Sequence, residues 1–436
     1  MPAENGVLRL ATASHPLDAV VDVPGSKSIA NRALICAALA DGDSHLTGLP
    51  GGDDTAAMLR GLAVLGVGVS ASGDGDALDA VVAGTGGRLD ASGVTVDAAL
   101  AGTTSRFLTA LAALAPGPVT IDGDPPLRQR PMGALHRVLA DLGVRVVAGE
   151  REGGLPVTVT GPLRRGGEVA LAGDVSSQYL TALMLVAPLL DGGLRLHLTT
   201  PLVSVPYVRL TATVMASFGV DGVSVGDEHI VVSPGRYRGT DLAIEPDATS
   251  AGYPLAMAAV AGGRVAVHGL HRTSAQGDAV FAADVLGRMG CTVDDDATGI
   301  VVSRDPAQPL TGIDVGMAGI SDLVPTLAVV AVMASTPTTI TGVGFIRAKE
   351  SDRLGDLAAA LGLLGAAVTV EPDGLRIDPA GPLHGGRLAT HHDHRLAMAY
   401  GVLATAVEGI EVVDPGVVTK SWPGFWTCRD RLLATR

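Results

Sequence analysis

The chain has only three lysines, against 28 arginines. Arginine can replace lysine on most solvated surfaces, but not where a compact ammonium must contact a phosphate or exchange a proton. We therefore treat Lys27, Lys349 and Lys420 as candidates for chemistry. Lys27 lies in Pro-Gly-Ser-Lys-Ser, Lys349 is followed by Glu350 and Arg353, and Lys420 stands in Thr-Lys-Ser-Trp-Pro. Chance survival of three lysines in an arginine-rich sequence is the alternative.

Composition limits the partners. The 436 residues are 47% hydrophobic and 17% charged, which is typical of a globular protein with a large core. A formal net charge of -14 disfavours nucleic acid and anionic membranes, although basic residues gathered in one cleft could bind a small anion. With no signal-peptide pattern and no apolar run of about 18 residues, we expect a cytoplasmic protein. Cys36, Cys291 and Cys428 are expected to be buried free thiols.

The elements that must position the lysines follow a sixfold repeat. A large apolar residue followed by glycine recurs five times, and the glycines are 71 to 77 residues apart. Each glycine closes an apolar helical stretch and precedes alternating valines, which predicts a helix C-cap followed by a β-hairpin. The glycines are Gly66, Gly143, Gly219, Gly290 and Gly365.

A second landmark keeps the same period: a strand, a small polar cluster and a helix rich in alanine and leucine. The clusters begin at residues 26, 102, 174, 247, 320 and 393, so six βαβαββ units fit the chain. Ser, Thr and Asp are favoured N-caps, and helix N-termini bind anions, so the six helix starts predict an anion-binding face. One helix end contributes only about 0.3 to 1 kcal/mol, so arginines and lysines must supply most of the affinity. Ordinary capping is the alternative for any single cluster.

At these positions the chain resembles the EPSP synthase family, the 3-phosphoshikimate 1-carboxyvinyltransferases. The resemblance covers about residues 21–425 and rests on about a dozen motifs in the family's order. The motifs are Pro24-Gly25-Ser26-Lys27-Ser28 with Asn31-Arg32, Ala101-Gly102-Thr103, Arg130-Pro131, Ser176-Ser177-Gln178, Ser204 with Pro206-Tyr207, Asp322, Lys349-Glu350 with Asp352-Arg353-Leu354, Asp393-His394-Arg395 and Lys420-Ser421.

The resemblance implies an α/β (α+β) fold of two similar globular domains, each of three βαβαββ repeats, in the inside-out α/β barrel arrangement of enolpyruvyl transferases. Residues 24–244 would form an inserted domain, and residues 1–23 with 245–436 would form the second. The N-terminal strand would return to pack with the second domain. The active site would lie in the interdomain cleft, which ligands would close.

The reaction of the family transfers the enolpyruvyl group of phosphoenolpyruvate to the 5-hydroxyl of shikimate 3-phosphate, through a tetrahedral intermediate, and releases phosphate. It needs an acid for the methylene carbon, a base for the hydroxyl, and cations that hold two polyanions together. By resemblance, Asp322 is the proton acceptor and Glu350 the proton donor, with Lys27 assisting. The alternative for Glu350 is a surface helix ion pair with Arg353.

The binding residues are carried over in the same way. A side chain at position 102 would intrude where the backbone must approach the ligand, so Gly102→Ala should hinder phosphoenolpyruvate and the inhibitor glyphosate, which occupies the same place. Phosphoenolpyruvate would contact Lys27, Gly102, Arg130, Gln178, Arg353, Arg395 and Lys420. Shikimate 3-phosphate would contact Lys27, Ser28, Arg32, Ser176, Ser177, Gln178, Ser204, Asp322 and Lys349.

Three positions depart from the family pattern. Leu100 and Phe345 stand where many relatives have asparagine, and Val205 replaces a common lysine. These departures affect individual substrate contacts rather than the reaction, and Arg347 or Thr341 are candidates to replace them.

Two other functions stay open. UDP-N-acetylglucosamine enolpyruvyl transferases share the repeat and the phosphoenolpyruvate chemistry, but usually carry a reactive cysteine in the loop corresponding to about 115–130, where this chain has none. An inactive anion-binding relative would keep the scaffold without turnover. No cofactor or metal is implied, because His391 and His392 are expected to form a surface pair before the Asp-His-Arg motif. The expected partners are the two small substrates, and a monomer is expected from the family.

Overall fold

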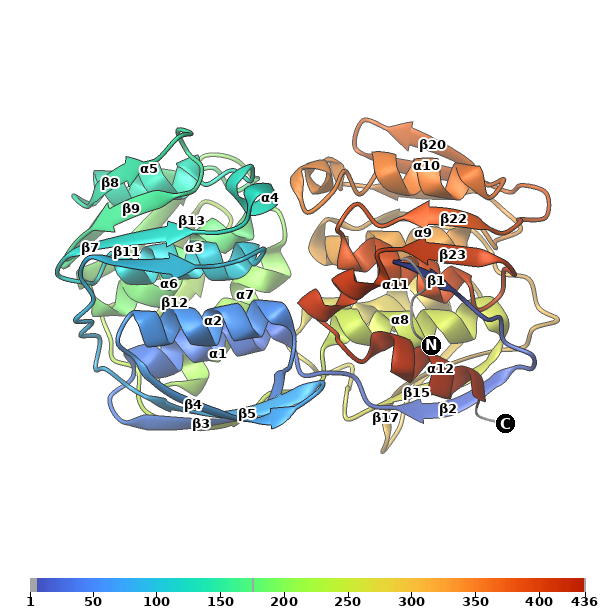
Figure 1. Cartoon of the computed structure of the whole chain (residues 1–436), viewed down its shortest axis with the longest axis horizontal. Coiled ribbons are helices and arrows are strands. Elements are labelled where there is room, and N and C mark those ends of the chain that lie inside the picture. Colours follow the sequence, from blue (N-terminus) through green and yellow to red (C-terminus); the bar gives the residue numbers. More distant parts are fainter. Residues whose placement is uncertain (1–5, 175, 435–436) are drawn as a thin grey trace. The chain divides into compact units, whose positions relative to one another are not determined.

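The computed structural model describes residues 6–174 and 176–434. It is a mixed α/β protein with six small mixed sheets (Figure 1). The chain separates into two compact units, each with its own hydrophobic core. We call residues 25–245 the inserted unit, and the described residues up to 24 and from 246 onward the flanking unit. Within the described part of the chain, no helix is long and apolar enough to cross a membrane.

Five of the six sheets have four strands in one order. The first strand of a repeat lies parallel to the second, the second pairs antiparallel with the fourth, and the third forms the opposite edge. The clearest repeat contains β6 (Val94–Asp97), α3 (Gly102–Ala112), β7 (Pro118–Asp122), α5 (Gly133–Asp141), β8 (Arg145–Ala148) and β9 (Val157–Thr160), with the short α4 (Pro125–Arg128) before α5. This is the predicted βαβαββ unit.

The other two repeats of the inserted unit follow the same plan. One contains β10 (Arg165–Leu171), α6 (Ser177–Val186), η1 (Ala187–Leu189), β11 (Asp191–Leu198), α7 (Val205–Ser217), β12 (Val223–Val225) and β13 (His229–Val232). The other contains α1 (Lys27–Leu39), β3 (Asp43–Pro50), α2 (Asp53–Val64), β4 (Gly68–Asp74) and β5 (Ala77–Ala83). Its first strand is β14 (Asp241–Ala243), which comes from the far end of the insertion and lies parallel to β3.

The flanking unit also holds three repeats. The first contains α8 (Ala248–Ala261), β15 (Gly263–His268), η2 (Gly277–Val280), η3 (Phe281–Gly287), β16 (Thr292–Asp295) and β17 (Gly299–Arg304). The second contains β18 (Asp314–Gly316), η4 (Ala318–Leu323), α9 (Val324–Ala331), β19 (Thr338–Thr341), η5 (Gly344–Ala348), α10 (Gly355–Leu363), β20 (Ala367–Glu371) and β21 (Gly374–Asp378). The third contains β22 (Gly386–Ala389), α11 (His394–Leu403), β23 (Ile410–Val413), η6 (Pro415–Lys420) and α12 (Phe425–Ala434).

The amino-terminal strands complete two sheets of the flanking unit. β2 (Leu17–Val21) lies parallel to β15, in the place that β14 takes in the inserted unit. β1 (Val7–Arg9) pairs antiparallel with β23, where the other repeats have a hairpin. The chain therefore joins the flanking unit at its start, leaves it for the insertion, and returns to it.

The repeat glycines end helices as predicted. All five have a positive φ, between 83° and 104°, a region where a Cβ is strained. After Gly66, the amide of Val67 donates to the carbonyl of Leu62, and the corresponding bond follows each of the other four glycines. The predicted helix C-caps are confirmed.

The polar clusters are N-caps in four of the six repeats. The side chains of Ser26, Ser176, Asp247 and Asp393 accept hydrogen bonds from backbone amides in the first turns of α1, α6, α8 and α11. The expectation is wrong for the other two clusters. α3 begins at Gly102, which has no capping side chain, and Asp322 lies in the 3-10 segment η4 ahead of α9. The carboxylate of Asp322 is therefore available for other contacts.

The helices that follow the clusters are buried along most of their length, as α8 is from Ala248 to Val260. Within each unit the sheets lie around these helices (Figure 1). All three cysteines are free, but only Cys36 and Cys291 are buried, while Cys428 is half-buried. The expectation of burial is therefore wrong for Cys428.

Candidate active site

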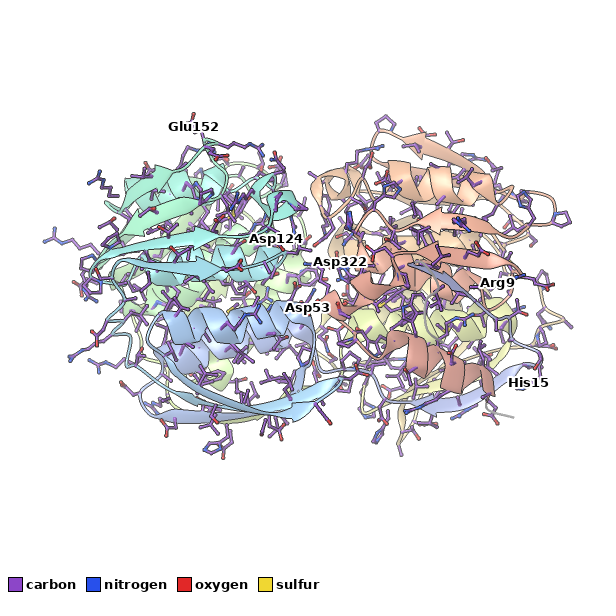
Figure 2. The ribbon with its side chains drawn as sticks, in the orientation of Figure 1. Arg9, His15, Asp53, Asp124, Glu152 and Asp322 are labelled. Atoms are coloured by element: carbon purple, nitrogen blue, oxygen red, sulfur yellow. The ribbon has the colours of Figure 1, made fainter. Side chains whose placement is uncertain are left out.

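Asp322 is the centre of a charged cluster in the flanking unit; it is labelled in Figure 2. Its Oδ1 accepts from Nζ of Lys349 at 2.7 Å and from Nη1 of Arg353 at 2.9 Å, and its Oδ2 accepts from Nη2 of Arg395 at 2.6 Å. Burial alone would raise the pKa of Asp322, but Arg395, Lys349 and Arg353 together hold this pKa well below its usual value. The carboxylate is ionised at neutral pH, which is the state that a proton acceptor needs.

Arg353 joins three carboxylates and is itself 1% exposed. Besides Asp322, it donates to Oε2 of Glu350 at 2.7 Å and to both oxygens of Asp393, at 2.7 and 3.3 Å. Burial would lower the pKa of Arg353, but Asp393, Glu350 and Asp322 raise it. Glu350 and Arg353 do form an ion pair, but neither residue lies in a helix and the arginine is buried. The alternative of an ion pair on the surface of a helix is therefore wrong.

Asp393 is fully buried and links this cluster to α11. Its Oδ1 accepts from the amide of Arg395 at 2.9 Å, and its Oδ2 accepts from the hydroxyl of Ser351 at 3.0 Å. One carboxylate thus orients Arg353 and the helix that carries Arg395. His391 and His392, just ahead of it, are exposed as expected.

The loop that carries Lys349 and Glu350 is held by the neighbouring hairpin. The carboxylate of Asp373 accepts from the amides of Gly342 and Gly344 at 3.0 and 2.8 Å. Arg347 pairs with Asp352 at 3.2 Å and donates to the carbonyl of Glu371 at 3.0 Å. Arg347, a candidate to replace a substrate contact, is engaged in holding this loop.

Arg395 contacts an aromatic cluster, and Lys420 lies on a segment that packs against the helix carrying Arg395. Lys420 is 6% exposed and belongs to η6, which packs against α11. Arg395 donates to the hydroxyl of Tyr253 at 3.5 Å, and burial raises the pKa of Tyr253 to about 12, against the opposing effect of Arg395. The Tyr253 ring meets Phe425 edge to face, and Phe425 meets Trp422 in the same way.

A further buried carboxylate lies on η2, which packs against α8 and η4. Asp278 is 5% exposed and accepts a hydrogen bond from the hydroxyl of Thr249, in the first turn of α8. The pKa of Asp278 is raised to about 6, mainly by burial and in part by Asp322, while Thr249 and Arg395 oppose the rise. Sequence reasoning did not find this group, because no pattern in the sequence reveals burial of a single acid.

In the inserted unit, Gly102 lies against two guanidinium groups. A Cβ at this position would come within 2.5 Å of Nη1 of Arg106 and closer still to Nη1 of Arg130. Arg106 is 3% exposed and donates to the carbonyl of Gly102 at 2.9 Å, to Oε1 of Gln178 at 3.0 Å and to the carbonyl of Pro131 at 3.2 Å. A side chain at position 102 would have to displace both guanidinium groups.

The start of α1 places two more predicted residues. Nζ of Lys27 lies 2.9 Å from Oδ2 of Asp54, which is buried in the first turn of α2. Arg32 is 3% exposed and donates to the hydroxyl of Thr211 at 2.9 Å and to the carbonyl of Ser28 at 2.7 Å. Burial lowers the pKa of Arg32 to about 10, against a raising effect of Tyr207.

The predicted serines lie at helix starts. Ser28 and Ser177 are half-buried in the first turns of α1 and α6, and Ser176 caps α6. Ser204 precedes α7 with φ 56° and ψ 39°, a left-handed conformation that is uncommon outside glycine. Such strain is concentrated at ligand sites, which agrees with a binding role for Ser204.

The structure thus brings the predicted residues into two groups. Asp322, Lys349, Glu350, Arg353 and Arg395 form one hydrogen-bonded cluster in the flanking unit. Gly102, Arg130 and Gln178 lie together in the inserted unit, around Arg106.

Sequence reasoning did not find two ion-pair partners: Asp54, which contacts Lys27, and Asp393, which it predicted only as a helix N-cap and which also contacts Arg353. A signal existed for both, because each stands at a helix start, in Gly-Gly-Asp-Asp-Thr and Asp-His-Arg.

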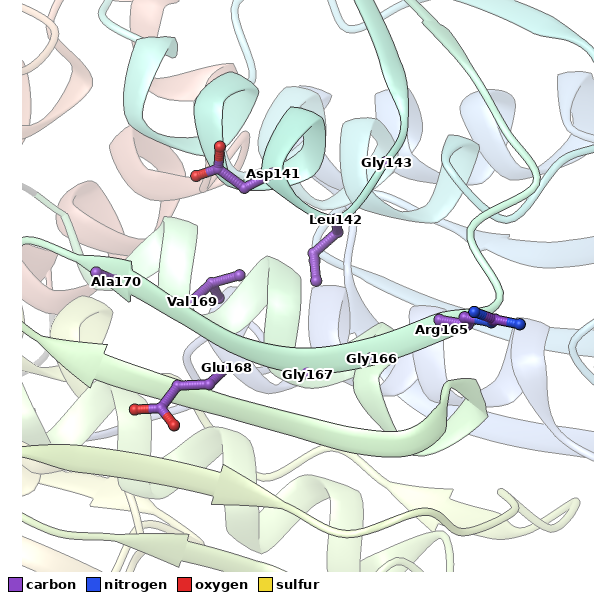
Figure 3. Close-up of a pocket in the computed structure, with 9 residues that line it drawn as sticks. All are labelled: Asp141, Leu142, Gly143, Arg165, Gly166, Gly167, Glu168, Val169 and Ala170. Atoms are coloured by element: carbon purple, nitrogen blue, oxygen red, sulfur yellow. The ribbon is translucent and has the colours of Figure 1, made fainter.

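A surface pocket elsewhere in the inserted unit contains none of these residues (Figure 3). It is lined by residues 141–143 at the end of α5 and residues 165–170 of β10. In the part of the chain that the structure describes, no three His, Cys, Asp or Glu side chains are grouped so that they could hold a metal ion.

Comparison with known proteins identifies the family. The family model described as EPSP synthase (3-phosphoshikimate 1-carboxyvinyltransferase) matches residues 11–428. A 3-phosphoshikimate 1-carboxyvinyltransferase of Methanosphaerula palustris is 42% identical over 414 residues, covering 94% of this chain and 96% of the relative. One from Nostoc punctiforme is 39% identical over 421 residues, covering 96% and 97%.

Solved structures give the same result. An EPSP synthase from Acinetobacter baumannii is similar with a TM-score of 0.81 and 25% identity over 98% of both chains. The enolpyruvyl transferase NikO from Streptomyces tendae shares the fold, with a TM-score of 0.76 and 20% identity over 99% of this chain and 98% of that one. The charged cluster around Asp322, the sixfold repeat and these full-length matches lead to one conclusion: the chain belongs to the EPSP synthase family.

Proposed function

We propose that the chain transfers the enolpyruvyl group of phosphoenolpyruvate to the 5-hydroxyl of shikimate 3-phosphate and releases phosphate. The observation that carries this function is the ionised carboxylate of Asp322, held by Lys349, Arg353 and Arg395 in a chain that matches the family from residue 11 to residue 428. A base surrounded by cations suits the deprotonation of a hydroxyl on an anionic substrate.

Asp322 acts as the proton acceptor for the 5-hydroxyl. Three cations now reduce its proton affinity, so the anionic groups of the substrates must draw part of that positive charge away before the carboxylate can accept a proton. Lys349 is well placed for this change, because burial lowers its pKa and its contact with Asp322 opposes that effect. The base would therefore become effective only when both substrates are bound.

Glu350 acts as the proton donor to the methylene carbon of phosphoenolpyruvate, with Lys27 assisting. The oxygen of the attacking hydroxyl bonds to the central carbon of phosphoenolpyruvate while the methylene carbon takes up a proton, which gives the tetrahedral intermediate. Loss of phosphate and of a proton from the new methyl group then restores the carbon–carbon double bond. Glu350 lies 2.7 Å from Arg353, so its proton would be delivered beside a fixed cation.

Binding of two polyanions needs several fixed cations. For phosphoenolpyruvate these are Lys27, Arg130, Arg353, Arg395 and Lys420, together with Gly102 and Gln178. For shikimate 3-phosphate the residues are Lys27, Ser28, Arg32, Ser176, Ser177, Gln178, Ser204, Asp322 and Lys349. Both sets draw on both units. The inside-out arrangement of the two three-repeat units, with the site between them, stays a prediction, as do the monomeric state and the cytoplasmic location.

The test is phosphate release by the purified protein with both substrates. We expect release that requires both phosphoenolpyruvate and shikimate 3-phosphate. Asp322→Asn and Lys27→Ala, one from each unit, should each reduce kcat by at least about 100-fold, since general acid or base catalysis contributes about 10² to 10⁴. An exposed control, Asp284→Asn, should leave kcat unchanged. Tight binding of shikimate 3-phosphate without release would instead indicate an inactive anion-binding relative.

A further inference from the structure

The ring of Phe345 faces a charged group of the candidate site. Nζ of Lys349 lies 5.7 Å from the centre of this ring, within the range of a cation–π interaction. Phe345 is half-buried on η5 and packs against the core of the flanking unit. The ring has no hydrogen-bonding atom, so it cannot supply the hydrogen bond that an asparagine would give to a substrate.

The ammonium of Lys349 has three donors. It donates to Oδ1 of Asp322 at 2.7 Å and to the hydroxyl of Ser321 at 3.3 Å, and no other described residue accepts a hydrogen bond from it. The lysine side chain is 25% exposed. A charged group with so little water around it is stabilised by the electron-rich face of an aromatic ring, which also limits where the ammonium can move.

We propose that Phe345 is a positioning residue: its ring holds the ammonium of Lys349 beside Asp322 and thereby sets how tightly shikimate 3-phosphate binds. This inference rests on the proposed function, in which Lys349 contacts that substrate. The loop around Phe345 supports it, because Asp373 fixes the backbone at Gly342 and Gly344 immediately before the ring. A ring on a fixed backbone can constrain a flexible lysine four residues later.

Phe345→Leu tests the proposal, because leucine keeps most of the apolar volume and removes the aromatic face. We expect KM for shikimate 3-phosphate to rise roughly three- to thirtyfold, the range for a partly desolvated cation–π contact, while KM for phosphoenolpyruvate stays within about twofold. Phe345→Tyr keeps the ring and should behave like the original protein. Phe281→Leu, at a buried position of the same unit, controls for loss of an aromatic side chain from the core.

A second readout does not depend on turnover. The chain has only three lysines, so ¹³C-dimethylated lysines give three side-chain NMR signals, and the signal of Lys349 is identified by its absence from Lys349→Arg. In Phe345→Leu the lysine keeps its half-buried position but loses the ring, so its pKa should fall below that in the original protein. The same pKa should be unchanged in Phe281→Leu.

The NMR titration and the KM values together distinguish failure of this proposal from failure of the proposed function. An unchanged pKa of Lys349 in Phe345→Leu refutes the proposal, whatever happens to KM, because the ring then does not act through the lysine. Equal rises of both KM values, shared by Phe281→Leu, would also refute it by assigning Phe345 to the core alone. If the original protein releases no phosphate, the proposed function fails, but the NMR titration still decides whether the ring holds Lys349.

Discussion

Asp278 allows a quantitative test of the electrostatics in the flanking unit. Asp278→Asn removes the charge but keeps the shape and an oxygen that can accept the hydrogen bond of Thr249. The pKa of Asp278 is about 6 in the folded protein, against 3.8 for an unperturbed aspartate, mainly because the side chain is buried. Since one pKa unit corresponds to about 1.4 kcal/mol, ionising this group in the folded state costs about 3 kcal/mol.

The direction of the pH dependence of stability follows from how many protons the folded and unfolded states bind. Between pH 3.8 and about 6 the unfolded chain loses this proton before the folded protein does, so the contribution of Asp278 to stability decreases as the pH rises through that range. The penalty is almost absent at pH 4 and complete at pH 8. Asp278→Asn has no carboxyl group to ionise at this position. The variant should therefore be more stable than the original protein by about 3 kcal/mol at pH 8 and by less than about 1 kcal/mol at pH 4.

Urea unfolding at the two pH values measures this difference. Asp284→Asn makes the same chemical change at an exposed position six residues later, and it should alter stability by no more than about 0.5 kcal/mol at either pH. A stability difference for Asp278→Asn that is the same at pH 4 and pH 8 would refute the reasoning. It would mean that Asp278 is ionised equally readily in the folded and unfolded states.

Three further predictions concern the site. The new methyl group in Gly102→Ala must displace the guanidinium groups beside it, so KM for phosphoenolpyruvate and the inhibition constant for glyphosate should both rise about tenfold or more. Unchanged inhibition by glyphosate would contradict the placement of phosphoenolpyruvate beside Gly102. Arg353→Met leaves three carboxylates without their shared cation and should destabilise the protein by about 3 to 5 kcal/mol in urea unfolding. Arg353→Lys keeps the charge but loses the planar guanidinium, so its stability should lie between those of Arg353→Met and the original protein. Equal stability of the original protein and both variants would show that the cluster is not buried as described. The only two tryptophans, Trp422 and Trp426, follow Lys420 closely, so phosphoenolpyruvate should change tryptophan fluorescence, and no change at a saturating concentration would argue against binding at Lys420.

The sequence predicted the repeat well because its signals are local. A glycine that ends a helix needs only its own backbone conformation, so Gly66 and its four counterparts could be recognised from spacing alone. The same holds for the side-chain N-caps at Ser26 and Asp393, which require only the residues of one helical turn. The same rule predicted side-chain N-caps at Gly102 and Asp322 and was wrong there. Gly102 has no capping side chain, and the carboxylate of Asp322 contacts cations instead.

The contacts among site residues could not be predicted, because they depend on tertiary packing. Nothing in the sequence indicates that Arg353 contacts Asp393, which lies 40 residues away, or that Arg106 bridges Gly102 and Gln178. Burial is equally invisible in the sequence, although it decides the pKa directions of Asp278 and Lys349. The family resemblance supplied the site residues, and the structure supplies the partners that set their charge states.

The pairing of β14 with β3 and of β2 with β15 has a consequence for synthesis of the chain. The inserted unit completes its first sheet with its own last strand, β14, so it can finish folding while the rest of the chain is still being made. β2 cannot pair until β15 has left the ribosome, about 240 residues later. At about 5 to 20 residues per second, this strand waits roughly 12 to 50 s. During that interval β2 is an unpaired apolar segment, so it is a part of the newborn chain where a chaperone would be useful.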